Sequence, residues 1–209
     1  MTTIYHITHI NNLPSIINYE GLLANSLLQT NQINYQDIAH NHIQNRRAKT
    51  PVPCSKGGTL HDYIPFYFAP RSPMLYTIYK GNVEGYTEGQ NPVIYLVSEA
   101  EAIEAYGLSF AFTDGHAVMA YAEFSDDLND LDFIDWELMK SKYWFDKQDD
   151  LNRKFRRQAE FLVHQFLPWE LITKIGVISH NYKTLTEELL RNIKNIPCPP
   201  VEVSRNWYY

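Results

Sequence analysis

The sequence is poor in cysteine and has no long apolar run, and each shortage removes a class of protein from consideration. Its two cysteines, Cys54 and Cys198, have no spacing to each other or to histidines that suggests a zinc site, and we expect reduced thiols. No run of about 18 apolar residues is present, so no transmembrane helix is predicted. The first residues lack the basic and apolar regions of a secretory signal. We therefore expect a cytoplasmic protein with no membrane association and no metal.

Charge is distributed unevenly along the chain. The net charge of −6 argues weakly against a nucleic-acid partner. However, much of the acid is gathered in residues 126–150, whereas residues 38–61 contain arginines and lysines and no acid. Residues 153–157 are basic at all positions but one. Because local patches decide where a phosphate backbone can bind, the two basic stretches keep nucleic acid among the candidate partners.

Short β-branched and aromatic runs, separated by turn residues, alternate with a few amphipathic segments. This pattern predicts an α+β fold. The length of 209 residues is sufficient for one sizeable core, so we expect a single domain over residues 1–209. The predicted strands are 4–8, 64–69, 92–97, 110–113, 158–163, 174–179 and 201–203.

Capping residues suggest where several helices begin and end. A helix is predicted to begin near Asn12 and to end at Gly21. Thr184 and Glu187 have the spacing of a capping box, which predicts a helix start before an apolar series that reaches Ile193. Further helices are expected over 38–47, 72–79 and 98–106.

Glu160 opens one of the predicted strands. The alternation of a strand places Glu160, Leu162 and His164 on one face. A carboxylate that opens an apolar strand, directly after the basic residues 153–157, suits a site for an anionic substrate and a cationic transition state. The alternative is a strand-end glutamate paired with one of those arginines.

Two other stretches could contribute to a site. The first predicts a strand that carries His6, followed by a helix with Ser15 in its first turn. Helix N-terminal amides favour phosphate and an imidazole can hydrogen-bond hydroxyls, so a ribose-bearing anion would fit, although a structural histidine is the alternative. The second, residues 66–76, places aromatic residues on a strand and the following helix, a pattern typical either of a binding site or of core packing.

These three stretches occur in the order found in the diphtheria-toxin-like class of ADP-ribosyltransferases. The sequence more closely resembles the DarT family, DNA ADP-ribosyltransferases that act as toxins of toxin–antitoxin systems. The resemblance extends from Ile4 to Tyr209 and implies one ADP-ribosyltransferase-like domain with split, antiparallel-rich central sheets and flanking helices. It departs from the poly-ADP-ribose polymerases at Ile7, where a glycine usually follows the histidine. The blocks that carry the resemblance are YHITHI, HIQNRR, GGTLHDYIPFYFAPRSPMLY, FTDGHAV and QAEFLV.

The resemblance implies NAD as co-substrate and Glu160 as the catalytic carboxylate. Arg47 matches a family position implicated in catalysis at the base. Because a guanidinium stays protonated, we expect Arg47 to stabilise a deprotonated thymine or to polarise its carbonyl, and a clamp on the NAD phosphates is the alternative. The residues implied in NAD binding are His6, Ile7 and Thr8 at the ribose and nicotinamide amide, Ser15 and Leu23 at the adenosine side, and Tyr76 or Tyr67 against the nicotinamide ring.

The implied reaction transfers ADP-ribose to a ring nitrogen of thymine in single-stranded DNA and releases nicotinamide. The resemblance also implies a cognate DarG-like antitoxin, and we expect a monomer. An RNA 2'-phosphate, tRNA or protein as acceptor is the alternative, and a binding module without activity is another. His116 is predicted either near the base or as a buried structural histidine. The DNA-binding candidates are Arg46, Lys49, His116, Tyr143, Trp144, Arg153, Arg156 and Arg157.

Overall fold

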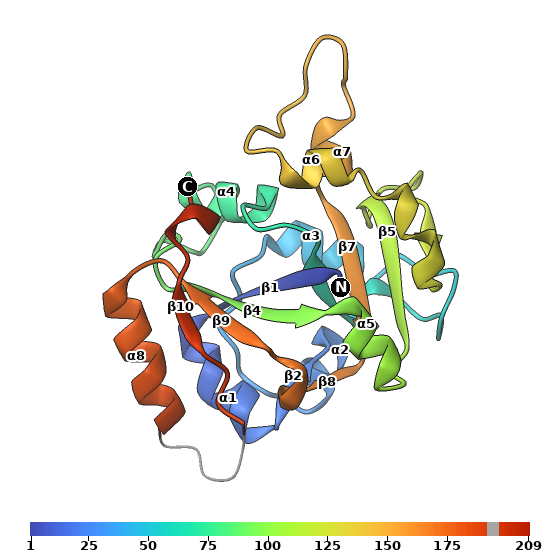
Figure 1. Cartoon of the computed structure of the whole chain (residues 1–209). Helices are drawn as coiled ribbons and strands as arrows, with labels where there is room; N and C mark the ends of the chain where they lie inside the picture. Colours follow the sequence, from blue (N-terminus) through green and yellow to red (C-terminus); the bar gives the residue numbers. More distant parts are fainter. Residues whose placement is uncertain (192–196) are drawn as a thin grey trace.

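A computed structural model describes residues 1–191 and 197–209, and at its centre lies an eight-stranded sheet (Figure 1). The strand order is β10-β9-β4-β1-β3-β7-β5-β6, and all neighbours are antiparallel except β10 and β9. The predicted α+β class with a mostly antiparallel sheet is therefore confirmed. The strands are β1 (Thr3–His9), β3 (Tyr63–Tyr67), β4 (Val93–Glu99), β5 (Phe110–His116), β6 (Phe124–Ser125), β7 (Ala159–His164), β9 (Lys174–Val177) and β10 (Val201–Val203).

A second, two-stranded sheet pairs β2 (Gly21–Leu23) with β8 (Phe166–Pro168). Gly21 permits this pairing, because a Cβ atom there would lie 2.3 Å from the carbonyl oxygen of Leu167. The prediction that Gly21 ends the first helix is wrong. That helix, α1 (Leu13–Asn18), ends earlier, and the chain turns through Glu20 in the left-handed region (φ +55).

Helices flank the sheet, and Figure 1 shows α8 along the side formed by β9 and β10. α8 begins at His180, so Thr184 lies inside the helix and the capping box predicted there is wrong. Ile193, which that prediction included, lies outside the described residues. None of the described helices is long and apolar enough to cross a membrane. The other helices are α2 (Asn25–Thr30), α3 (Asn41–Arg47), α4 (Pro73–Tyr79), α5 (Ala100–Ala105), α6 (Trp136–Lys140), α7 (Arg153–Arg156) and α8 (His180–Arg191).

The large sheet is nearly split between β1 and β3. These strands meet in register at one pair, Tyr5 with Tyr67, whereas β1 pairs with β4, and β3 with β7, along their whole lengths. A side chain bridges the seam, since His6 Nδ1 lies 2.8 Å from the carbonyl oxygen of Pro65. Residues of both strands line the main cleft of the molecule. The split predicted from the family resemblance is thus present as a seam.

The core determines which way Glu160 faces. Along β7, Phe161 and Val163 belong to the largest apolar cluster, on one face of the sheet. Leu162 packs on the other face, in a smaller cluster that includes Tyr63. Alternation therefore places Glu160 on the face of Leu162, as the sequence predicts, at the edge of this smaller cluster.

Candidate active site

The main cleft has a volume of about 720 Å³, within the range of pockets that bind cofactors. Its walls come from the strands β1, β3 and β7, from helices and loops in the first half of the chain, and from the segment that precedes β7. Every residue that the sequence implied in catalysis or NAD binding lines this cleft: His6, Ile7, Thr8, Ser15, Leu23, Arg47, Tyr67, Tyr76 and Glu160.

Glu160 is a buried carboxylate, 4% exposed, at the start of β7. Its Oε2 accepts a 2.6 Å hydrogen bond from Arg47 Nη1. Its Oε1 lies 3.4 Å from the main-chain nitrogen of Ala117 and 3.5 Å from His116 Nδ1. Burial alone would raise the pKa of Glu160, but the charge of Arg47 and the contact with His116 outweigh it and lower the pKa to about 2. Glu160 is therefore ionised at neutral pH.

Arg47 reaches Glu160 from the last residue of α3, 113 positions away in the chain. The predicted alternative, in which Glu160 pairs with one of the arginines of residues 153–157, is wrong. Arg47 is 9% exposed, and its Nη2 is buried with no hydrogen-bond partner among the described residues. A buried donor without a partner is costly, so this nitrogen is suited to a carbonyl or anionic oxygen of a ligand.

His6 is held in one tautomer. The carbonyl oxygen of Pro65 can only accept, so Nδ1 carries the proton and donates across the seam, and Nε2 is an acceptor. Burial lowers the pKa of His6 to about 4, although the Pro65 carbonyl opposes this shift. A neutral imidazole with Nε2 as acceptor can bind a hydroxyl group, which agrees with the predicted ribose contact.

The loop that follows α2 contributes residues 35–37 to the lining of the cleft. Thr8 Oγ1 accepts a 3.0 Å hydrogen bond from Asn12 Nδ2, and Asn12 Oδ1 accepts a 2.7 Å bond from the main-chain nitrogen of Gln36. These bonds fix the loop beside β1. Ser15 and Leu23, predicted to contact the adenosine side, also line the cleft.

Tyr67 and Tyr76 line the cleft from different elements, β3 and α4. Tyr67 pairs in register with Glu160, and burial together with the charge of Glu160 raises its pKa, so its hydroxyl stays protonated. Tyr76 lies on α4, which begins at the predicted Ser72–Pro73 cap, where Ser72 Oγ accepts from the nitrogen of Leu75. Both rings remain candidates for the nicotinamide contact.

The DNA-binding candidates near the first basic stretch lie at or near the cleft. His116 ends β5 and lines the cleft beside Glu160, after an irregularity in the β5–β7 register. Arg46 also lines it, is exposed, and donates from Nη2 to the carbonyl oxygen of Val118 at 2.9 Å. Lys49 is exposed but does not line the cleft.

The second basic stretch is largely occupied by protein oxygens. Arg157 is 4% exposed and donates to the carbonyl oxygens of Leu138 (2.7 Å), Met139 (2.6 Å) and Pro70 (2.7 Å). The prediction that Arg157 binds DNA phosphate is therefore wrong, because its guanidinium is committed to holding α6 and the β3–α4 connection together. Arg156 is half-buried and forms ion pairs with Asp135 and Asp150, at 2.9 and 2.6 Å.

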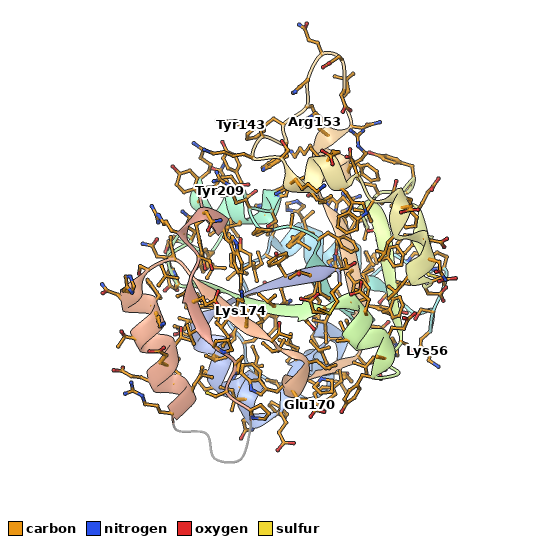
Figure 2. All side chains as sticks on the ribbon, viewed as in Figure 1. Lys56, Tyr143, Arg153, Glu170, Lys174 and Tyr209 are labelled. Atoms are coloured by element: carbon orange, nitrogen blue, oxygen red, sulfur yellow. The ribbon has the colours of Figure 1, made fainter. Side chains whose placement is uncertain are left out.

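The segment between α6 and α7 projects from the body of the molecule (Figure 1). Figure 2 shows Tyr143 and Arg153 at its base, where Arg153 Nη2 donates to the carbonyl oxygen of Tyr143 at 2.8 Å. Tyr143 is 68% exposed and does not line the cleft. Trp144 is 2% exposed and does line it, so the two neighbouring aromatics have opposite environments.

Comparison with known proteins determines the family. A family model described as "DarT: ssDNA thymidine ADP-ribosyltransferase" matches residues 5–209. This chain belongs to the DarT family. A DNA ADP-ribosyl transferase of Thermus sp. (strain 2.9) is 46% identical to it over 211 residues, which cover 100% of this chain and 96% of that protein. The family that the sequence resembles is thus confirmed.

Solved DarT structures share the fold. Thermus sp. 2.9 DarT in complex with ADP-ribosylated ssDNA has a TM-score of 0.92 and 43% identity, covering 100% of this chain and 96% of that one. The same protein in complex with NAD+ has a TM-score of 0.89 and 41% identity, covering 100% and 98%. A DNA ADP-ribosyl transferase–DNA ADP-ribosyl glycohydrolase fusion protein of Thermosipho africanus is 27% identical over 200 residues, which cover 94% of this chain and 47% of that protein.

Some cleft residues of this DarT-family chain escaped the sequence reasoning. Asn25 and Tyr35 line the cleft, and Asn25 Nδ2 donates to Tyr35 Oη at 2.6 Å. No local pattern joins these two residues. Phe155 also lines the cleft, and its ring lies where a Cβ of Gly115 would be, at 2.3 Å. A phenylalanine inside the basic stretch and a glycine directly before His116 were signals that could have predicted this packing.

Proposed function

We propose that this protein transfers ADP-ribose from NAD to a ring nitrogen of thymine in single-stranded DNA and releases nicotinamide. The observation that supports this most directly is the ionised, buried Glu160 beside a guanidinium nitrogen without a partner, in the cleft of a DarT-family chain. The relatives named above are DNA ADP-ribosyl transferases, and one is described in complex with NAD+ and with ADP-ribosylated ssDNA.

NAD would lie along the cleft as a co-substrate. The volume fits a dinucleotide, and His6 Nε2 offers an acceptor for a hydroxyl of the nicotinamide ribose. Ile7 and Thr8 would contact the nicotinamide side from β1, with Tyr67 or Tyr76 against the ring. Ser15 and Leu23 would contact the adenosine side. In the part of the chain that is described, no group of three or more histidines, cysteines or carboxylates could hold a metal ion. The absence of a metal from the reaction stays a prediction.

Catalysis would depend on charge at the ribose. Breaking the bond between ribose and nicotinamide develops an oxocarbenium-like cation, which the Glu160 carboxylate stabilises directly and through the 2'-hydroxyl. The ribose–nicotinamide bond breaks with its electron pair going to nicotinamide, the thymine nitrogen bonds to the ribose carbon, and the proton of that nitrogen is released to solvent. Arg47 stays protonated and cannot take that proton, so its free Nη2 would stabilise the thymine anion or a thymine carbonyl. His116 lies near the other carboxylate oxygen of Glu160 and would face the base.

The acceptor strand would run past the mouth of the cleft. Arg46 and Lys49 supply exposed cations on one side, and Arg153 and Arg156 supply cations whose charge is partly balanced by Asp150 on the other. The exposed ring of Tyr143 is available for base stacking, and Trp144 would act from inside the cleft.

The biological setting follows from the family. A toxin of this kind requires a partner that neutralises it, and the Thermosipho africanus fusion joins a transferase of this family to a DNA ADP-ribosyl glycohydrolase. We infer a DarG-like antitoxin for this chain, cytoplasmic action where NAD and DNA are both present, and a monomer in which residues 1–209 act as one domain.

Mass spectrometry of acceptors tests the proposal. The protein is incubated with NAD and, separately, with thymine-containing single-stranded DNA, the same oligonucleotide without thymine, RNA, tRNA and a protein mixture. We expect the mass of one ADP-ribose to be added to the thymine-containing DNA alone. A label on RNA, tRNA or protein would overturn the proposed DNA acceptor but not the proposed NAD site. No label on any acceptor would mean that the protein is a binding module without transferase activity.

A further inference from the structure

Tyr209 lies outside the cleft but contacts two aromatic residues that line it, Tyr76 and Trp144 (Figure 2 labels Tyr209). We propose that Tyr209 is a positioning residue for the DNA acceptor, which fixes Trp144 at the cleft and thereby anchors the projecting segment between α6 and α7. The inference rests on the proposed function, because it names the residue that sets the acceptor side of the same site.

The hydroxyl group of Tyr209 is fully used. Its oxygen accepts a 2.7 Å hydrogen bond from Trp144 Nε1, and it donates to the carbonyl oxygen of Arg71, 2.5 Å away. The carbonyl oxygen of Ser72 lies further away, at 3.3 Å. A phenol has one proton to donate, so one hydroxyl connects the indole of the projecting segment to the turn before α4.

The ring of Tyr209 is held on several sides. The guanidinium carbon of Arg71 lies 4.5 Å from its centre, and the ring of Tyr76 packs edge-on with centroids 5.0 Å apart. The main chain of Tyr209 is fixed independently by Gln90, which accepts from its nitrogen at 3.1 Å and donates to its oxygen at 2.6 Å. Because main chain and ring are both fixed, the hydroxyl has a defined position to offer Trp144.

Trp144 is the residue for which this position matters. Its neighbours in the projecting segment are open to solvent, with Tyr143 68%, Phe145 46% and Leu151 73% exposed, whereas Trp144 is 2% exposed. The indole is therefore the buried contact of a projecting segment, beside the partly exposed Phe145, whose ring also packs against Tyr76 with centroids 5.3 Å apart (Figure 1). Releasing its N–H would let the aromatic wall of the cleft and the segment beyond it shift together.

Tyr208 supplies a matched control. It is the adjacent residue, it is 2% exposed, and its hydroxyl donates to the carbonyl oxygen of Val93 at 2.8 Å. Among the described residues, Tyr208 does not line the cleft and makes no hydrogen bond or ring contact with Trp144 or Tyr76. Tyr208→Phe thus removes a buried hydroxyl whose hydrogen bond has a similar length, and it changes no contact with Trp144 or Tyr76.

The test compares Tyr209→Phe with Tyr208→Phe. We expect Tyr209→Phe to raise the KM for a thymine-containing oligonucleotide by about tenfold, the effect of leaving the Trp144 N–H without its acceptor, with NAD affinity and kcat nearly unchanged. Tyr208→Phe should lower the melting temperature and leave this KM unchanged. Tyr209→Leu, which also removes the ring from Tyr76, should weaken NAD binding in addition. Equal oligonucleotide KM values in both Phe variants would overturn the proposal.

Hydrogen–deuterium exchange gives a readout that needs no acceptor. In Tyr209→Phe, main-chain amides of residues 141–152 should exchange faster than in the unmodified protein, and in Tyr208→Phe they should not. Unchanged exchange in Tyr209→Phe would refute the anchoring role even if the protein modified no oligonucleotide. Failure of the positioning proposal and failure of the proposed function are therefore distinguishable.

Discussion

Residues 46–47 and 153–157 are both rich in arginine, and the two stretches behave differently in the folded chain. At the end of α3, Arg47 uses one nitrogen for Glu160 and keeps another buried without a partner at the cleft. Around α7, Arg157 donates from both Nη atoms to three carbonyl oxygens, and its buried Nε, also without a partner among the described residues, does not line the cleft; Arg156 pairs with two aspartates. The difference shows that the number of cations in a stretch does not determine its role. The oxygens that the fold places around each guanidinium do.

Removing the carboxylate partner of Arg47 should have the largest effect. Glu160→Gln keeps the shape of the side chain and loses the charge that faces the developing cation, so transfer should fall by about 100- to 1,000-fold. NAD binding, measured by calorimetry, should change little, because the charge matters most in the transition state. Glu137→Gln, a change at a side chain that is 89% exposed, is the control. Retained transfer would remove Glu160 from the mechanism.

A matched pair within the first stretch sharpens the role of the free nitrogen. Arg47→Lys keeps a positive charge near Glu160 but supplies no second planar donor, so transfer should fall by roughly 100-fold. Arg46→Lys, one residue earlier and exposed, should change transfer only slightly. The measurement is single-turnover transfer to a thymine-containing oligonucleotide. Equal losses in the two variants would mean that the unpartnered Nη2 has no special part in the reaction.

In the second stretch, the effect should be on stability. Arg157→Met leaves the carbonyl oxygens of Met139 and Pro70 without a donor, while Leu138 keeps the one from the nitrogen of Ser141, so the free energy of unfolding should fall by about 3 kcal/mol and the melting temperature by roughly 6 to 12 °C. The salt dependence of DNA binding should stay the same. Arg205→Met, at an exposed position, is the control for stability. If Arg157→Met instead reduced the salt dependence of DNA affinity and left the stability normal, Arg157 would be a DNA-binding residue after all.

The smallest effect is expected at Lys154, the exposed cation of the second stretch that lines the cleft. No carboxylate lies within ion-pair distance of it among the described residues. Lys154→Gln should reduce the slope of log affinity for single-stranded DNA against log salt by about 0.7, the value for one phosphate contact. Lys183→Gln, on α8 and paired with Glu187, should leave the slope unchanged. An unchanged slope in Lys154→Gln would place the strand elsewhere.

Local pattern predicted much of the fold and many residues of the candidate site. The alternation around Glu160 predicted β7 and its facing, and Ser72 with Pro73 predicted the start of α4, because both signals arise within a few residues. The family resemblance supplied the roles expected of His6 and Arg47. Their predicted positions agree with the cleft that the structure shows.

What failed depends on contacts between distant residues. The pairing of Glu160 with Arg47 spans 113 positions, and no local pattern distinguishes it from pairing with the adjacent arginines. The burial of Arg157 depends on three carbonyl groups from two other segments. Likewise α8 begins at His180 rather than at Thr184, because packing on β9 and β10 outweighs a capping signal inside the helix.

The seam between β1 and β3 gives the cleft a mechanical character. Elsewhere in the sheet, separating two strands would break a ladder of main-chain hydrogen bonds, but here one registered pair and the imidazole of His6 connect the two halves. Moving β1 away from β3 would therefore break fewer main-chain hydrogen bonds than parting β1 from β4 or β3 from β7. His6 lies at this seam, so the group that would bind the ribose also supplies a hydrogen bond between the two halves of the sheet.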